Sequence, residues 1–386
     1  MKVKQVYDIV NFMTKELLGE TDLTVAEDLS NVVTVGEAIF NATEVDNYVR
    51  TLVDHIGKVI FVNRVYRGTV PSVIKDGWEY GSVVQKIRAT LPEATENESW
   101  ELQAGTSYDM DIFTPPTVVN KFFNSKVTFE IPVSFTDKQV KESFDNAQQL
   151  NAFYSMITNE VNKSMDIKLN QLAKRTINNA IAETLHAEYP LNNFTEQSGV
   201  KAVNVLKLYN DDKGTALTAD KCITDADFLR FASVTMRKYV KRLSEISTLF
   251  NIGGTEKYTP TDYLHVVLLD DFMAGAEGYL QSDTYHKELV ALPKADSVPY
   301  WQGSGKTYAF KDISKINVKT ASDGQPIEIS GVLGVMFDRD ACGVSNLDLR
   351  VKTHYNEKGE FTNNWYKMDA GYFNDLDENC VVFFVA

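Results

Sequence analysis

Residues 146–181 read NAQQLNAFYSMITNEVNKSMDIKLNQLAKRTINNAI, and this stretch decides the fold. Its apolar residues recur every three or four positions, which places them on one face of an α-helix; they are Leu150, Phe153, Ile157, Val161, Met165, Leu169, Leu172, Ile177 and Ile181. A helix of roughly 40 residues extends about 60 Å. The opposite face carries Asn, Gln, Lys and Ser without heptad-paired charges, which disfavours a coiled coil. We therefore predict one long strut with a single buried face.

The segments before this helix predict a cap, strands and an arm. Thr136 and Gln139 have the spacing of a capping box, so a short helix is expected there, interrupted near Phe144 and Asp145. Residues 57–133 are rich in β-branched and aromatic residues and predict a long two-stranded excursion. Residues 1–56 hold short helical patterns without an obvious core, and we expect an extended arm that lies on another surface.

Charge is segregated along residues 57–133. Basic residues predominate first and acidic residues follow without an intervening Lys or Arg; the two sets include Arg64, Arg67, Lys75, Lys86 and Arg88, and then Glu93, Glu96, Glu98 and Glu101. A two-stranded ribbon is marginally stable alone in water. Against a second copy, the two limbs can meet complementary charges that fix the register. We predict that these residues form contacts between subunits, although a solvated hairpin with scattered charges explains the charge pattern equally well.

Beyond the long helix, helices and strands are mixed. Residues 204–223, NVLKLYNDDKGTALTADKCI, are predicted to form a hairpin around the Asp-Asp-Lys-Gly turn. Thr224 and Asp227 are expected to cap a helix that begins near Phe228. A buried strand is predicted at 263–271, a weaker helix at 273–290 and a loop-rich stretch through Gln325, followed by strands to the C-terminus.

Composition and charge disfavour several classes of function. The 386 residues are 44% hydrophobic, and the formal net charge is −14 without a basic patch or tail, which is unlike proteins that grip nucleic acid phosphates. Cys222, Cys342 and Cys380 lack CxxC spacing, so neither disulfides nor a zinc site is expected. The N-terminus lacks a signal-peptide pattern, and no apolar run has the length of a membrane span.

Short motifs with chemical meaning are better explained as structure. Residues 303–307, GSGKT, resemble a phosphate loop, but Tyr300 occupies the position of the first glycine and the expected strand and helix are missing. Asp338-Arg339-Asp340 resembles the start of a calcium loop, but Cys342 occupies a ligand position, so a turn between strands is expected. Two carboxylate pairs and five dispersed histidines lack partners at a telling spacing; they are Asp109 with Asp111, Asp270 with Asp271, His55, His186, His265, His286 and His354. No catalytic, cofactor-binding or metal site is predicted.

The order of these elements resembles the Hong Kong 97 type major capsid protein of tailed bacteriophages, in its podophage-like branch. Residues 52–61, LVDHIGKVIF, and 77–88, GWEYGSVVQKIR, are similar to the entry and a strand of the family's extended loop. Residues 135–157, FTDKQVKESFDNAQQLNAFYSMI, are similar to the entry into its spine helix. ISGVLGVMFDRDACGV at 329–344 and WYKMDAGYFND at 365–375 resemble its closing strands. The likeness in layout covers nearly the whole chain.

The resemblance implies an α+β fold with five segments. They are an N-terminal arm (1–56), an extended β-hairpin loop (57–133), a peripheral domain with the spine helix (134–192), an axial domain (193–328) and closing strands of the peripheral domain (329–386). It also implies a major capsid protein without enzymatic activity, which assembles itself through pentamers and hexamers into an icosahedral head around double-stranded DNA.

The resemblance further implies partners and a location. We expect contacts with copies of the same chain, a separate scaffolding protein and a portal, DNA enclosed without sequence-specific binding, and no membrane. The protein would be made and assembled in the host bacterial cytoplasm and would end in the virion. Other functions remain open: a different virion structural protein, an encapsulin-like nanocompartment shell, or a nucleotide-binding enzyme that uses Lys306.

Overall fold

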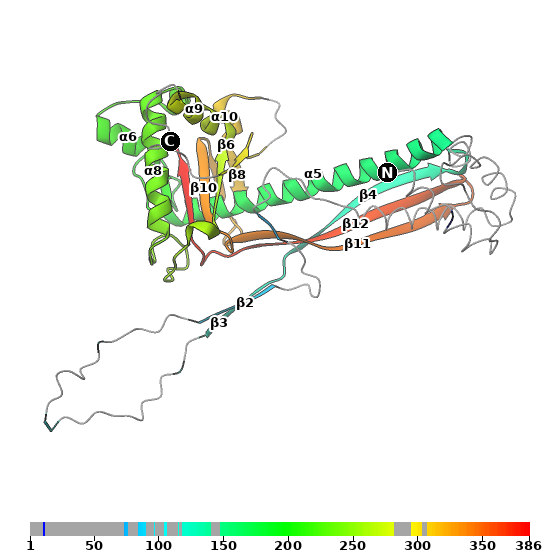
Figure 1. The fold of residues 1–386 in the computed structure, drawn as a ribbon, viewed down its shortest axis with the longest axis horizontal. Coiled ribbons are helices and arrows are strands. Elements are labelled where there is room, and N and C mark those ends of the chain that lie inside the picture. Colours follow the sequence, from blue (N-terminus) through cyan, green and yellow to red (C-terminus); the bar gives the residue numbers. More distant parts are fainter. Residues whose placement is uncertain are drawn as a thin grey trace.

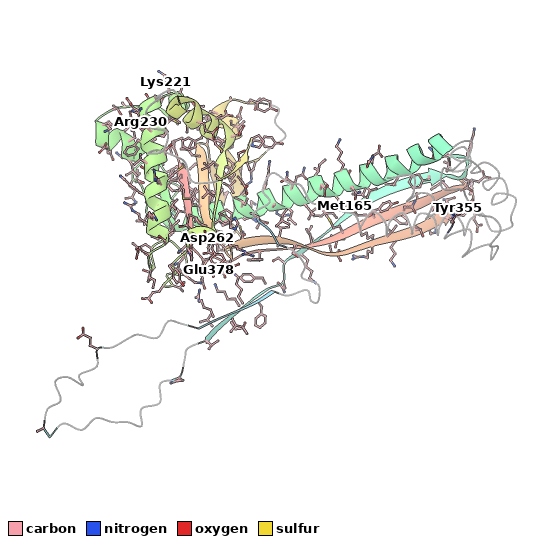
Figure 2. All side chains as sticks on the ribbon, in the orientation of Figure 1. Met165, Lys221, Arg230, Asp262, Tyr355 and Glu378 are labelled. Carbon is pink, nitrogen blue, oxygen red and sulfur yellow. The ribbon has the colours of Figure 1, made fainter. Side chains whose placement is uncertain are left out.

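The computed structural model describes residues 11, 73–75, 84–89, 96, 104–105, 115, 118–139, 147–281, 295–302 and 307–386. Figures 1 and 2 show three parts: a unit of helices and strands that holds the C-terminus and is called the C-terminal unit below, a long limb, and a ribbon that projects from their junction. The ribbon pairs β2 (Val84–Ala89) with β3 (Val118–Phe123). Apart from Asn11, the predicted N-terminal arm lies outside the described residues.

The predicted strut is a single helix, α5, which spans the 42 residues Ala147–Glu188. The predicted apolar stripe is buried at Val161, Met165, Leu169, Leu172, Ile177 and Ile181, while the side chains of Leu150, Phe153 and Ile157 lie outside the described part. The predicted capping box is also confirmed. The Gln139 N–H donates to Thr136 Oγ1 at 3.3 Å, and the Thr136 N–H donates to Gln139 Oε1 at 3.0 Å.

A four-stranded sheet lies along the first part of α5 (Figure 1). Its order is β1-β11-β12-β4, from β1 (Ile74–Lys75), β11 (Cys342–Asn356), β12 (Phe361–Asn374) and β4 (Lys126–Thr136). Every second side chain of β12 is buried, at Thr362, Asn364, Tyr366, Met368 and Ala370. The other face carries ion pairs, such as Lys367 with Glu130 at 2.8 Å. The helix therefore covers one face of the sheet and leaves a polar face opposite.

The described strands place two segment boundaries differently from the sequence-based expectation. Residues 126–133, expected in the extended loop, belong to β4 and pair with β12. Their alternating half-buried side chains, from Val127 to Val133, pack against the core that α5 covers. The closing strands, expected together in the peripheral domain, divide between two sheets, because β10 (Val332–Asp338) and β13 (Cys380–Phe384) pair with each other away from β11 and β12.

The C-terminal unit is built on a five-stranded sheet with the order β5-β13-β10-β6-β7. Its other strands are β5 (Ala202–Asn204), β6 (Leu264–Leu269) and β7 (Asp296–Val298). Helices α8 (Ala226–Leu243) and α9 (Asp270–Gln281) pack against each other, and the short 3-10 helix Thr261–Tyr263 precedes β6. Aromatic edge contacts join the layers: the rings of Tyr239 and Phe383 lie 5.3 Å apart. The predicted buried strand at 263–271 is confirmed as β6.

The hairpin predicted at residues 204–223 is wrong. Val205–Lys213 form the helix α6, and Ala219–Cys222 form the short helix α7. Asn204 caps α6 by accepting the Lys207 N–H at 3.1 Å, and Gly214 ends it in the left-handed conformation at φ 63°. The apolar residues Val205, Leu206 and Tyr209 have helical spacing and are buried, so the Asp-Asp-Lys-Gly sequence ends a helix instead of joining two strands.

Two further local predictions needed correction. Asp225, not Thr224 or Asp227, caps α8 by accepting the Phe228 N–H at 2.8 Å. The loop-rich stretch through Gln325 contains α10 (Phe310–Ile313) and β8 (Ile316–Lys319), which pairs with β9 (Pro326–Ile329).

Gly331 separates β9 from β10. Its φ is +98°, and a Cβ at this position would lie 2.1 Å from the Val385 carbonyl oxygen. Only glycine tolerates this combination of conformation and close approach. Across the part of the chain that the structure describes, no helix combines the length and apolarity needed to cross a membrane.

Candidate functional site at the base of the β2–β3 hairpin

The β2–β3 ribbon has two chemically different faces. Lys86 pairs with Lys121 across the strands, and Arg88 lies two residues from Lys86, so these three cations share one face. Ile87 and Phe122 belong to the opposite face, where they are 68% and 62% exposed. The ribbon therefore has one cationic face and one exposed apolar face.

The cationic face meets an acidic turn between β12 and β13. This turn carries Asp375, Asp377 and Glu378. Backbone hydrogen bonds hold it to the body of the protein, because the Ile252 N–H donates to the Leu376 carbonyl at 2.9 Å and the Asp375 N–H donates to the Ala341 carbonyl at 2.6 Å. The backbone that carries these carboxylates is therefore held in place independently of the hairpin.

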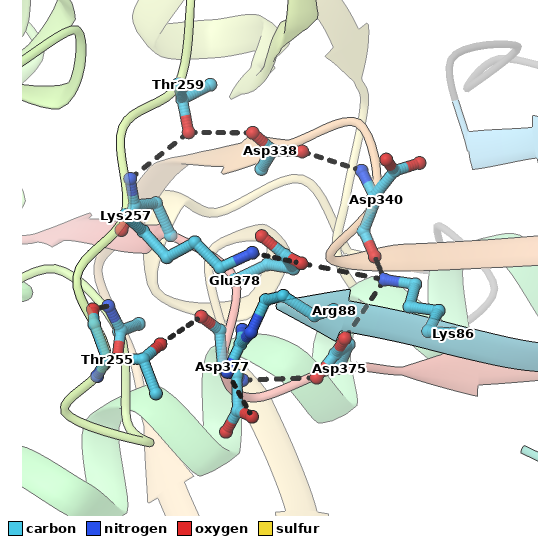
Figure 3. Close-up of polar contacts among 12 residues, drawn as sticks. Lys86, Arg88, Thr255, Lys257, Thr259, Asp338, Asp340, Asp375, Asp377 and Glu378 are labelled. Atoms are coloured by element: carbon cyan, nitrogen blue, oxygen red, sulfur yellow. Dashed lines mark hydrogen bonds and ion pairs between the residues drawn. The ribbon is translucent and has the colours of Figure 1, made fainter. Parts of the chain in front are cut away.

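Four cations bind these three carboxylates, and we call the whole set the hairpin-base cluster; Figure 3 labels its members other than Lys121. Asp375 accepts from Lys86 at 3.0 Å and from Lys121 at 3.1 Å. Asp377 pairs with Arg88 at 3.4 Å and also contacts Lys121. Glu378 pairs with Lys257 at 2.8 Å and lies 3.9 Å from Lys86. Lys86 also donates to the Asp340 carbonyl.

Burial makes Asp375 the centre of the hairpin-base cluster. Its side chain is only 3% exposed, whereas those of Lys86 and Lys121 are 22% and 36% exposed. Burial alone disfavours the ionised carboxylate, but the charges and hydrogen bonds of Lys86 and Lys121 outweigh it and lower the pKa of Asp375. Burial likewise opposes the charge of Lys121, and the contacts with Asp377 and Asp375 outweigh it and raise the pKa of that amine.

Aromatic contacts reinforce the ionic attachment. The rings of Phe123, from β3, and Phe373, from β12, lie 5.3 Å apart. The Lys86 ammonium lies 5.9 Å from the centroid of the first ring and 5.2 Å from that of the second. The hairpin base is therefore held by both charge and apolar contact, and its direction relative to the body is defined.

The predicted contact residues are placed unevenly. Lys86 and Arg88 bind acids of their own chain, and Glu96 is exposed. Lys75 lies in β1, and its side chain is outside the described part. The remaining predicted contact residues lie outside the described residues: Arg64, Arg67, Glu93, Glu98 and Glu101.

Sequence reasoning missed Lys121 and the acidic turn. The signal was the sequence NDLDEN at 374–379, three acids between two strong strand patterns. Such a turn is ordinarily solvated, and the partner that gives it a role lies more than 250 residues earlier, since Lys86 and Asp375 are 289 positions apart.

The motifs that were explained as structure can be placed only in part. Asp338-Arg339-Asp340 forms the predicted turn between β10 and β11, where Asp338 accepts from Thr259 at 2.7 Å and from the Asp340 N–H at 2.9 Å. Residues 303–306 of the glycine-rich segment lie outside the described residues. Among the described residues, no cluster of three or more His, Cys, Asp or Glu is arranged to hold a metal ion.

The chain is similar to phage head proteins. A family model described as Phi29-like phage major capsid protein matches residues 10–384. The major capsid protein of Bacillus phage GA-1 is 22% identical over 197 residues, which cover 49% of this chain and 39% of that protein. The chain therefore aligns with well under two thirds of the length of this curated relative.

The chain is also similar to chains of solved phage structures. A chain in the structure of the head fiber and inner core protein gp22 of native bacteriophage P68 has a TM-score of 0.50 and 10% identity, over 84% of this chain and 86% of that chain. A chain in the capsid structure of Staphylococcus phage Andhra has a TM-score of 0.48 and 9% identity, over 84% and 86%. With the family match, the predicted α+β fold of the Hong Kong 97 type is confirmed.

Proposed function

Because the chain belongs to the Phi29-like phage major capsid protein family, we propose that it is the repeating subunit of an icosahedral phage head. In this proposal, copies assemble through pentamers and hexamers into a closed shell that encloses double-stranded DNA. The observation that carries the proposal is the projecting hairpin, which is anchored on one face and exposes apolar side chains on the other.

The hairpin would be only marginally stable in an isolated monomer. Two-stranded ribbons are at best marginally stable in water, and this ribbon keeps Ile87, Val118 and Phe122 more than half exposed. The hairpin-base cluster turns the cationic face toward its own chain, so the apolar face points away from it. A second copy that covers this apolar face would remove it from water and stabilise the ribbon.

Charged residues beyond the ribbon would set the register between copies. We propose that Arg64, Arg67 and Lys75 meet acids of a neighbouring copy, and that Glu93, Glu96, Glu98 and Glu101 meet cations. Lys86 and Arg88 contribute differently in this proposal, because they hold the hairpin in the direction from which it can reach a neighbour. Several moderate contacts per subunit then add up, since closed symmetry converts weak contacts into a stable assembly.

The remaining elements of the proposal follow from a shell-forming role. The net charge of −14 fits a protein that surrounds DNA better than one that grips its phosphates. We propose that the shell is built in the host bacterial cytoplasm with a separate scaffolding protein and a portal, that the protein then resides in the virion, and that it catalyses no reaction.

Charge reversal tests the proposed contact. In the variant R64E/R67E, we expect a folded chain, judged by circular dichroism and thermal melting, that no longer forms shells visible by electron microscopy. Normal shells from this variant would refute the role of Arg64 and Arg67. The variant K311E/K319E is a matched control, because it reverses two exposed lysines of the C-terminal unit and should assemble normally.

A further inference from the structure

The last two turns of α8 carry a compact group of cations. Arg237, Lys238, Lys241 and Arg242 are all exposed, and we call them the α8 basic surface. At about 100° per residue they cover one continuous face of roughly 140° on the helix. The opposite face is buried in the C-terminal unit. The sequence contains no Asp or Glu between Asp227 and Glu245, so no acid of the helix neutralises this face.

The helix dipole explains part of this group. Cations in a last helical turn are stabilised by the helix dipole, which accounts for Lys241 and Arg242. Arg237 and Lys238 lie a turn earlier, where this effect has faded. Among the described residues, no ion pair involves Lys238 or Lys241. Like charges this close repel one another, so Lys238 and Lys241 favour an external acidic partner.

Exposed apolar side chains continue the α8 basic surface. The loop after α8 is folded back by two backbone hydrogen bonds between Ser247 and Lys257, at 3.0 and 3.1 Å. It presents Ile246 at 58%, Leu249 at 58% and Tyr258 at 54% exposure. A partner that fits both parts of this surface must combine acidic and apolar residues in one short segment.

The chain itself contains such a segment. Residues 92–113, PEATENESWELQAGTSYDMDIF, lie between β2 and β3 and carry six acids without any Lys or Arg. They also supply Trp100, Leu102 and Phe113 among their apolar residues. Figure 1 shows β2 and β3 as a ribbon that projects from the junction between the long limb and the C-terminal unit. In the proposed shell, the hairpin that carries this segment reaches a second copy of the chain.

We propose that the α8 basic surface of one copy, with Ile246, Leu249 and Tyr258, binds residues 92–113 of a second copy. This inference rests on the proposed function and names the receptor for the hairpin. The contact is head-to-tail, because different surfaces of the two copies meet, and repeated rotation by the same angle closes such contacts into a ring. Double-stranded DNA could use the four cations, but it offers nothing to the adjacent apolar side chains.

A charge-swap experiment tests the contact in the full-length chain. The variants K238E/K241E and E98K/E101K should each assemble at least about tenfold less well than wild type at equal concentration, because attraction becomes repulsion at two positions. The combined variant should recover most of the assembly. K311E/K319E should assemble as wild type does. Sedimentation and electron microscopy measure the assembled fraction, and thermal melting verifies folding.

Cross-linking tests the same contact between copies directly. In assemblies mixed from ¹⁴N- and ¹⁵N-labelled chains, a zero-length carbodiimide reagent should join a peptide containing Lys238 or Lys241 to one from residues 92–113, with mixed labels. If K238E/K241E assembles like wild type, or if these cross-links are absent from intact assemblies, the inference is overturned. If that variant loses only binding to a duplex DNA probe, the surface serves DNA and the inference also fails. A wild-type chain that never assembles would contradict the proposed function as well.

Discussion

The substitution Asp375→Asn should release the hairpin base without unfolding the protein. Asp375 is buried and accepts from two ammonium groups, at 3.0 Å from Lys86 and 3.1 Å from Lys121. A hydrogen bond to a charged group contributes about 1.5–3 kcal/mol. Both lysines are partly exposed and can rehydrate, and Asp377 and Glu378 remain as partners, so we expect a loss of about 2 kcal/mol, at the low end of that range.

This loss would appear as local opening of the ribbon. About 2 kcal/mol corresponds to roughly 30-fold faster amide hydrogen exchange at β2 and β3, while β10 and β13 in the central sheet keep their protection. Asp212→Asn is the matched control, because it removes an exposed carboxylate that pairs with Lys213 at 3.1 Å, far from the hairpin. Unchanged exchange at β2 and β3 in Asp375→Asn, or equal acceleration in the control, would refute the anchoring role of the hairpin-base cluster.

The attachment should also depend on pH, because the pKa of Asp375 is lowered from 3.8. The stabilisation from Asp375 is present above 3.8 and is lost as the pH falls through the lower pKa of the folded state. This loss should appear as faster amide hydrogen exchange in β2 and β3 after correction for intrinsic rates. At the other extreme, the raised pKa of Lys121 predicts that its stabilisation is lost only as the pH rises above 10.5, which the same measurement checks. Glu183→Gln should lower the free energy of unfolding by about 1–2 kcal/mol, because Glu183 is buried and accepts hydrogen bonds from Ser322, from its N–H at 3.0 Å and from its hydroxyl at 2.7 Å. A denaturant titration measures this, and an unchanged unfolding midpoint would contradict it. Gly331→Ala should destabilise the protein by more than about 1 kcal/mol, whereas Gly278→Ala, at an open position in α9, should be neutral or stabilising, and the reverse order of melting temperatures would contradict the account of Gly331.

The sequence predicts the elements that depend on local periodicity. The 42-residue helix, its capping-box neighbour and the strand β6 follow from residue spacing alone, because buried faces repeat at the helical or strand period. The failure at residues 204–223 has a physical cause as well. The Asp-Asp-Lys-Gly sequence suits a hairpin turn and a helix C-terminus equally, and the burial of Val205 and Tyr209 decides between them.

The sequence predicts only the basic half of the candidate site. The basic residues Lys86 and Arg88 are visible as a charged stretch, but their partners Asp375 and Asp377 lie between β12 and β13, which pair with the sequence-distant strands β4 and β5. The face that each cation occupies depends on the register between β2 and β3. A shift of that register by one residue would place Lys121 on the face opposite Lys86 and Arg88 and would mix charged and apolar side chains on both faces, and a single sequence does not specify the register.

The central claim is that this chain is completed by copies of itself. Sedimentation velocity of the purified full-length protein across a wide concentration range, with electron microscopy of each fraction, tests it most directly. The account predicts that the fraction of chains in rings or closed shells increases as the concentration rises. A compact monomer at the highest concentration, with its hairpin amides fully protected, would contradict it.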